Sequence, residues 1–160
     1  MDPQIALSAE LFNVSTALVK RALQDLDPED LLATPGEDSN PAIAILAHLA
    51  HTRCSLLRHL GSDTKLPWQA RFGRGGSVDN PAAYPSKDEF LAVWNQATQE
   101  LATRLETITA DELAGRAPRE PPVKDKTLRG TISFLAYHEG YHVGQLAYLR
   151  KWSGKPSLVG

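Results

Sequence analysis

TLRGTISFLAYHEGYHVGQLAYLRKW, residues 127–152, is a proline-free stretch that follows Pro121-Pro122 and ends before Gly154 and Pro156. These boundaries predict a helix of about seven turns. At about 100° per residue, one face of this helix collects apolar side chains together with two histidines. That face comprises Phe134, Leu135, His138, His142, Leu146, Leu149 and Trp152. Both histidines therefore lie within the apolar stripe that is expected to face the protein interior.

Three other stretches have the same amphipathic period and predict helices. They extend from Ile5 to Asp25, from Pro41 to Leu60, and from a capping box at Ser86 to Ile108. Four helices of about five to seven turns with little strand signal are typical of an all-α four-helix bundle. We expect one domain over residues 1–160, with a long loop at Gly61–Pro85 between the second and third of these helices.

Composition excludes several classes of function. The chain has 160 residues with 17 basic and 19 acidic side chains, and its formal charge of −2 provides no strong positive field for nucleic acid. Its single cysteine, Cys54, cannot form an internal disulfide, and the first residues lack the features of a signal peptide. The apolar runs end well short of the roughly 20 residues that cross a bilayer. We expect a cytoplasmic protein that binds neither nucleic acid nor membrane.

The two histidines of the last helix lie one turn apart, and this spacing favours a metal site over hydrogen-bonded core histidines. Buried neutral imidazoles need partners, and two of them one turn apart can donate lone pairs to one metal ion. Residues 138–142 also spell H-E-x-x-H, the motif of zinc proteases. However, a metzincin would carry glycine and histidine where this chain has Gln145 and Tyr148, and no acidic residue follows His142. A protease is therefore disfavoured, and a third ligand is expected from upstream.

The helix of residues 41–60 contains the candidates for that third ligand. His48 lies among apolar residues and can point into the bundle. His51 lies about 60° away on the helix and could be a fourth ligand or a residue that supports a ligand, although a solvated surface histidine is the better explanation. His59 lies near the helix end, where a cation is favoured by the helix dipole. Cys54 is better explained as a small buried apolar residue than as a ligand or nucleophile.

Two segments resemble those of the DinB-like family, which includes the YfiT-type metal hydrolases and bacterial thiol-dependent transferases. The first is IAILAHLA at residues 43–50, and the second and more specific is HEGYHVGQL at residues 138–146. The resemblance covers nearly the whole chain. It implies a DinB-type bundle, often dimeric, in which His48, His138 and His142 hold one divalent metal ion and water completes the metal shell.

Three histidine ligands leave coordination positions open, so the metal could activate water or a thiol. We therefore expect a metal-dependent hydrolase, or a transferase that uses a low-molecular-weight thiol, acting on a small-molecule substrate. Glu139 is the nearest candidate proton acceptor, with a solvated helix glutamate as the alternative. Gln145 could orient a metal histidine or a bound water, although an ordinary polar helix position explains it slightly better. Zinc or nickel is the expected metal, because imidazole suits both. The alternative is a non-catalytic metal-binding or sensor module.

Two helix faces predict a homodimer. The helix of residues 41–60 has apolar side chains on the face opposite His48, so it should be buried on two sides. These side chains are Ile43, Leu46, Ala50 and Leu57. The last helix has a small-residue face, and each mid-helix glycine costs about 1 kcal/mol relative to alanine. That face comprises Ala136, Gly140, Gly144 and Ala147. Close packing within one chain or between two subunits would explain it.

Overall fold

The computed structural model describes residues 1–37, 39–65, 68 and 83–159. Within these residues the regular elements are helices, with one isolated β-bridge between Arg116 and Thr127. The four long helices are α1 (Ala6–Leu23), α3 (Ala42–His59), α5 (Lys87–Thr107) and α7 (Leu128–Trp152), and the short ones are α2 (Pro28–Leu32) and α6 (Ala110–Ala114). The predicted all-α four-helix bundle is confirmed. The predicted bounds of the long helices are within two residues of the observed ones. Most of the predicted long loop lies outside the described residues.

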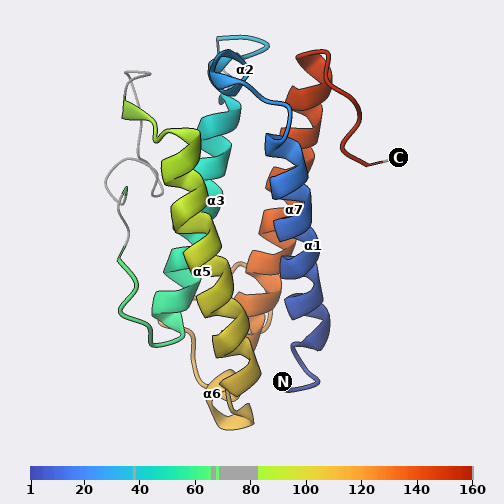
Figure 1. Ribbon diagram of the computed structural model, residues 1–160. Helices are drawn as coiled ribbons and strands as arrows, with labels where there is room; N and C mark the ends of the chain where they lie inside the picture. The colour runs from blue at the N-terminus through green and yellow to red at the C-terminus, as the bar shows by residue number, and fades with distance from the viewer. Residues whose placement is uncertain (38, 66–67, 69–82, 160) are drawn as a thin grey trace.

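Figure 1 shows how the four long helices are arranged. The helices α1 and α7 run in one direction, whereas α3 and α5 run in the other, and the chain crosses the length of the bundle between α3 and α5. The main contacts join α1 to α7, α3 to α5, and α3 to α7. Since α3 and α7 are antiparallel neighbours, histidines halfway along both helices can meet.

Local signals in the sequence set the ends of these helices. The Ser86 hydroxyl accepts from the Glu89 amide, and the Glu89 carboxylate accepts from the Ser86 amide, which completes the capping box of α5. Gly61 ends α3 with a φ of 88°, a left-handed conformation that favours glycine. Near the start of α7, a Cβ on Gly130 would lie 2.0 Å from the Asp125 carbonyl oxygen, so only glycine fits there.

The face of α3 opposite His48 is buried within the monomer. Its four apolar residues, Ile43, Leu46, Ala50 and Leu57, are at most 2% exposed. Three of them share a core cluster with Phe90 and Trp94 of α5 and with residues of α1. Burial of α3 on two sides is thus achieved within one chain. This face is therefore not available to a second subunit, contrary to what the sequence suggested.

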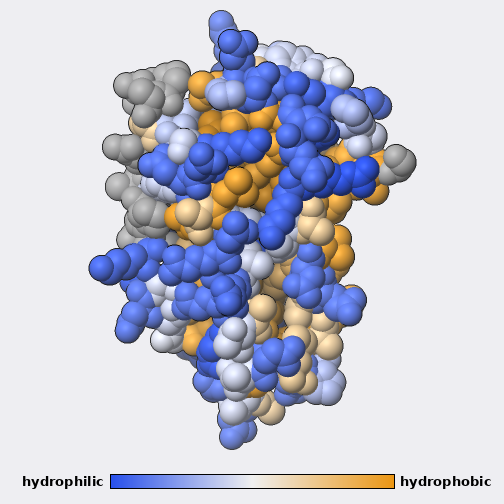
Figure 2. Space-filling model, viewed as in Figure 1, coloured by the Kyte–Doolittle hydropathy of each residue, from blue (hydrophilic) through white to orange (hydrophobic). Residues whose placement is uncertain are grey.

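The face of the molecule seen in Figure 2 mixes hydrophilic and hydrophobic residues. In the upper half of that view, hydrophobic residues are visible between bands of hydrophilic side chains. Across the described ranges of the chain, we find no helix with the length and hydropathy required to cross a membrane.

Candidate metal centre

Helices α3 and α7 bring His48, His138 and His142 together at one point. The Nε2 atom of His138 lies 3.3 Å from Nε2 of His48 and 3.1 Å from Nε2 of His142. One nitrogen from each ring lies within 4.8 Å of the other two, and all three side chains are half-buried. The rings meet at steep angles, 73° between His138 and His142, so that their edges and not their faces converge.

This arrangement fits a transition-metal ion. Imidazole nitrogens bound at 2.0–2.1 Å with tetrahedral angles lie about 3.3 Å apart. The two measured Nε2 separations, 3.3 Å and 3.1 Å, are close to that value. Three neutral nitrogen donors also suit divalent ions such as zinc and nickel. The three histidines could therefore hold one metal ion with positions left open for another molecule.

Gln145 fixes the tautomer of His142. Its side-chain oxygen lies 2.7 Å from Nδ1 of His142, and because an amide oxygen can only accept, Nδ1 carries the proton. This leaves a lone pair on Nε2, which points toward His138. The Gln145 amide group in turn donates to the Tyr141 hydroxyl at 3.3 Å, and the Tyr141 ring meets the edge of the His142 ring. Gln145 thus occupies the orienting position that the sequence suggested for it.

The surroundings of His138 and His142 favour the neutral form of both rings. Burial, with smaller contributions from His142 and His48, lowers the pKa of His138 from 6.5 to about 4. Burial and the neighbouring His48 also lower the pKa of His142, and the hydrogen bond to Gln145 partly opposes this. Because only the neutral ring can donate a lone pair, low pKa values favour metal binding over protonation.

This low pKa makes the stability of the metal-free protein depend on pH. The unfolded chain takes up the His138 proton near the ordinary histidine pKa of 6.5, and the folded chain only near 4. Between these values the unfolded state binds more protons, so the free energy of unfolding should decrease as the pH falls from 6.5 toward 4. Urea unfolding with chelator present would measure this, and His138→Gln should show a smaller decrease. An identical decrease in both proteins would contradict the prediction.

His51 and His59 do not join the cluster. Among the described residues, the group of side chains that could hold a metal consists of His48, His138 and His142. His51 and His59 are half-buried, and burial lowers the pKa of each. The Nδ1 atom of each is buried and has no hydrogen-bond partner in the part of the chain that the structure describes. His51 therefore lies outside the group that could hold a metal, and it is half-buried.

Glu139 points away from the histidines, into the bundle. It is 1% exposed, and both carboxylate oxygens accept hydrogen bonds from Arg53 of α3. Burial raises the pKa of Glu139, and the guanidinium group of Arg53 opposes that rise. Its predicted role as proton acceptor stays a prediction, because no finding tests it. Sequence reasoning missed Arg53, whose signal was that it is the one Lys, Arg, Asp or Glu between Ile43 and Leu57.

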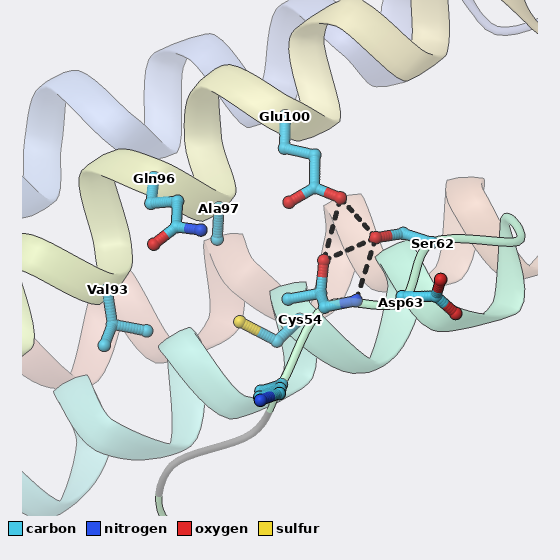
Figure 3. Close-up of a pocket in the computed structure, with 9 residues that line it drawn as sticks. Cys54, Ser62, Asp63, Val93, Gln96, Ala97 and Glu100 are labelled. Carbon is cyan, nitrogen blue, oxygen red and sulfur yellow. Dashed lines mark hydrogen bonds between the residues drawn. The ribbon is translucent and has the colours of Figure 1, made fainter.

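A cavity lies elsewhere, between α3 and α5. It measures about 610 Å³ and is lined in part by Cys54, Gln96 and Glu100 (Figure 3). At its rim the hydroxyls of Ser62 and Thr64 donate to one oxygen of Glu100. Burial raises the pKa of Cys54 to about 11, which disfavours the reactive thiolate form. None of the three clustered histidines lines this cavity.

Comparisons with known proteins agree with this structure. The family model of the DinB superfamily matches residues 11–146. Among solved structures, YfiT from Bacillus subtilis is similar over 98% of this chain and 91% of its own, with 15% identity and a TM-score of 0.66. YfiT is described as a probable metal-dependent hydrolase with an unusual four-helix bundle topology, and at this identity the likeness shows the fold. No curated protein matches the chain. The chain belongs to the DinB superfamily.

Proposed function

We propose that this protein binds one divalent transition-metal ion through His48, His138 and His142 and acts as a metal-dependent hydrolase or as a transferase of small thiols. The observation that carries the proposal is the convergence of three Nε2 atoms. That of His138 lies 3.1 Å from that of His142 and 3.3 Å from that of His48. The description of YfiT as a probable metal-dependent hydrolase supports it. A bound metal would lower the pKa of a coordinated water or thiol and polarise a substrate.

The residues around the cluster would assist in defined ways. Gln145 holds His142 in the tautomer that presents Nε2. Tyr141 is 56% exposed, and its ring meets the edge of the His142 ring, with 5.0 Å between the ring centroids. Phe134, whose ring centroid lies 6.0 Å from that of His138, provides an apolar neighbour on the same helix.

Metal analysis and an activity screen test the proposal together. Protein purified without an affinity tag should contain one zinc or nickel ion per chain. The loaded protein would then be incubated with simple esters and amides, and separately with a thiol and an electrophile. Metal-dependent turnover in either screen supports an enzyme, whereas bound metal without turnover supports the second candidate, a non-catalytic metal-binding or sensor module.

The Glu139→Gln variant separates two roles for that residue. If Glu139 accepts a proton, the variant should keep its metal and lose about 10²- to 10⁴-fold in rate. If Glu139 instead supports the site through Arg53, the variant should bind metal more weakly. Metal titration and rate measurement on the same sample would decide between them.

We also propose that two copies associate through an open face formed by α1 and α7. Apolar residues are exposed on both helices, among them Leu7 at 72% and Tyr137 at 68%. Gly140 and Gly144 of α7 are exposed as well, and an added Cβ at either would meet no atom within 4 Å. Close packing inside the monomer therefore does not account for these glycines. A second copy would cover the face and supply that packing.

Replacing Leu11 on this face by lysine should convert the dimer to a monomer. Leu11 is 42% exposed, so the substitution places a charge in the proposed interface without disturbing the core. Sedimentation equilibrium at micromolar concentration would measure the association. Leu32→Lys is a matched control, because Leu32 is 44% exposed on α2, outside this face. A monomeric wild-type protein would refute the dimer.

The single free cysteine, Cys54, is relevant to the cellular location of the protein. Cys54 is buried and reduced, and single free thiols are usual where glutathione keeps the compartment reducing. We therefore keep the cytoplasm as the proposed location.

A further inference from the structure

Arg53 is a fully buried charge at the centre of the bundle. Its side chain is 0% exposed, and the side chain of its partner Glu139 is 2% exposed. The Arg53 Nε group donates to Oε1 of Glu139 at 2.8 Å, and Nη2 donates to Oε2. This two-point pairing of planar groups defines the relative orientation of α3 and α7 more narrowly than a single contact would.

The remaining donors of Arg53 reach the other two long helices. Its Nη1 group donates to the hydroxyl of Thr16 in α1 at 2.9 Å and to that of Thr98 in α5 at 2.6 Å. Its Nη2 group also donates to the Phe12 carbonyl oxygen of α1 at 3.4 Å. All five N–H groups of the guanidinium are thereby used. One side chain of α3 therefore binds α1, α5 and α7 at once.

The acceptors of Arg53 are themselves held in place. Thr16 donates to the Phe12 carbonyl oxygen and Thr98 to the Trp94 carbonyl oxygen, so each hydroxyl has its oxygen lone pairs free for Arg53. The guanidinium carbon lies 3.8 Å from the centroid of the buried Trp94 ring, which covers one face of the cation. The polar groups of Arg53, Glu139, Thr16 and Thr98 are thus all paired with one another or with the backbone.

The network is immediately next to the histidine cluster. Glu139 follows His138 directly in α7, and Arg53 lies five residues after His48 in α3, which corresponds to about 7.5 Å along the helix axis. A slide of α3 against α7 by one residue would move His48 by about 1.5 Å. A shift of that size would take His48 out of coordinating distance, since metal–nitrogen bonds tolerate only about 0.2 Å.

We infer that Arg53 and Glu139 are positioning residues, which set the register of α3 against α7 and so bring His48 to His138 and His142. This inference rests on the metal site proposed above. Stability alone gives a poor reason for such a pair, because well-packed apolar residues of similar volume often stabilise a core as well or better. A role in fixing the register of the two helices does explain why a buried pair with every Arg53 donor satisfied is present.

Cobalt binding tests the inference, with Arg53→Lys and Glu139→Gln as the variants. Lysine keeps the charge but cannot pair with both oxygens of Glu139 while reaching Thr16 and Thr98. We expect both variants to be folded by circular dichroism and to bind Co²⁺ at least about ten-fold more weakly, with a changed visible absorption spectrum. Should one variant fail to fold, the other carries the test.

Arg150→Lys is the matched control. Arg150 also lies in α7 and is 2% exposed, but it donates to the Ala22 carbonyl oxygen and to Asp25, not to α3. The control should lose stability yet keep the wild-type Co²⁺ affinity and spectrum. Wild-type affinity and spectrum in Arg53→Lys and Glu139→Gln would overturn the inference, and so would an equal loss in Arg150→Lys.

A measurement without metal distinguishes failure of this inference from failure of the metal site. The ring centroids of His48 and His138 lie 5.2 Å apart, so nuclear Overhauser effects between their ring protons should be visible in the metal-free protein. We expect them to weaken in Arg53→Lys and to persist in Arg150→Lys. If the wild type binds no Co²⁺, the proposed function fails. The comparison of nuclear Overhauser effects still tests whether Arg53 sets the register of α3 against α7. Unchanged effects in Arg53→Lys would overturn the inference whatever the metal result.

Discussion

A His142→Ala variant should lose its bound metal almost completely. The substitution removes one of three proposed ligands, and the two that remain leave too few protein donors for a stable site. Because the metal binds only the folded chain, it stabilises the protein by RT ln(1 + [L]/Kd), about 4 kcal/mol at a thousand-fold excess over Kd. Elemental analysis should therefore show an empty variant, and chelator should lower the melting temperature of the wild type but not of His142→Ala.

His51→Ala is the control for this prediction. His51 is also half-buried and lies on α3 with His48, yet it stands outside the cluster that could hold a metal among the described residues. It should keep one metal ion per chain and the wild-type response to chelator. A His142→Ala protein that still binds one metal ion with wild-type affinity would show that the three-histidine site is wrong.

The fold was predictable because its signals are local. Helix period, the capping box at Ser86 and the glycine at 61 define where helices begin and end from a few neighbouring residues. The pair formed by His138 and His142 was predictable for the same reason, since residues four apart share a helix face. The convergence of His48 with them depends on how α3 packs on α7, and the resemblance to a known family supplied what the helix period left open.

What sequence reasoning missed depends on pairing between distant segments. Arg53 and Glu139 are far apart in the chain, and only the antiparallel packing of α3 on α7 brings them together. The sequence also suggested that the outer face of α3 needs a second subunit. The structure buries that face within one chain, because the crossover places α5 beside α3. Helix order in space is not encoded in the period of any single helix.

Removing the charge of Arg53 alone should cost the protein a large part of its stability. Arg53→Met leaves the Glu139 carboxylate buried without its partner, and breaking a buried ion pair in this way costs about 3–5 kcal/mol. Domains of ordinary stability have only about 5–15 kcal/mol in total. Urea unfolding would measure the loss as a lower midpoint at unchanged slope.

The double variant Arg53→Met/Glu139→Leu should recover most of that stability, because neither buried charge remains and the apolar side chains fill a similar volume. It should not recover metal affinity, since the paired groups that hold α3 in register with α7 are gone. A double variant as unstable as Arg53→Met would mean that the ion pair itself stabilises the fold. A stable double variant that binds Co²⁺ like the wild type would mean that packing alone positions His48, and the ion pair would then have no role at the metal centre.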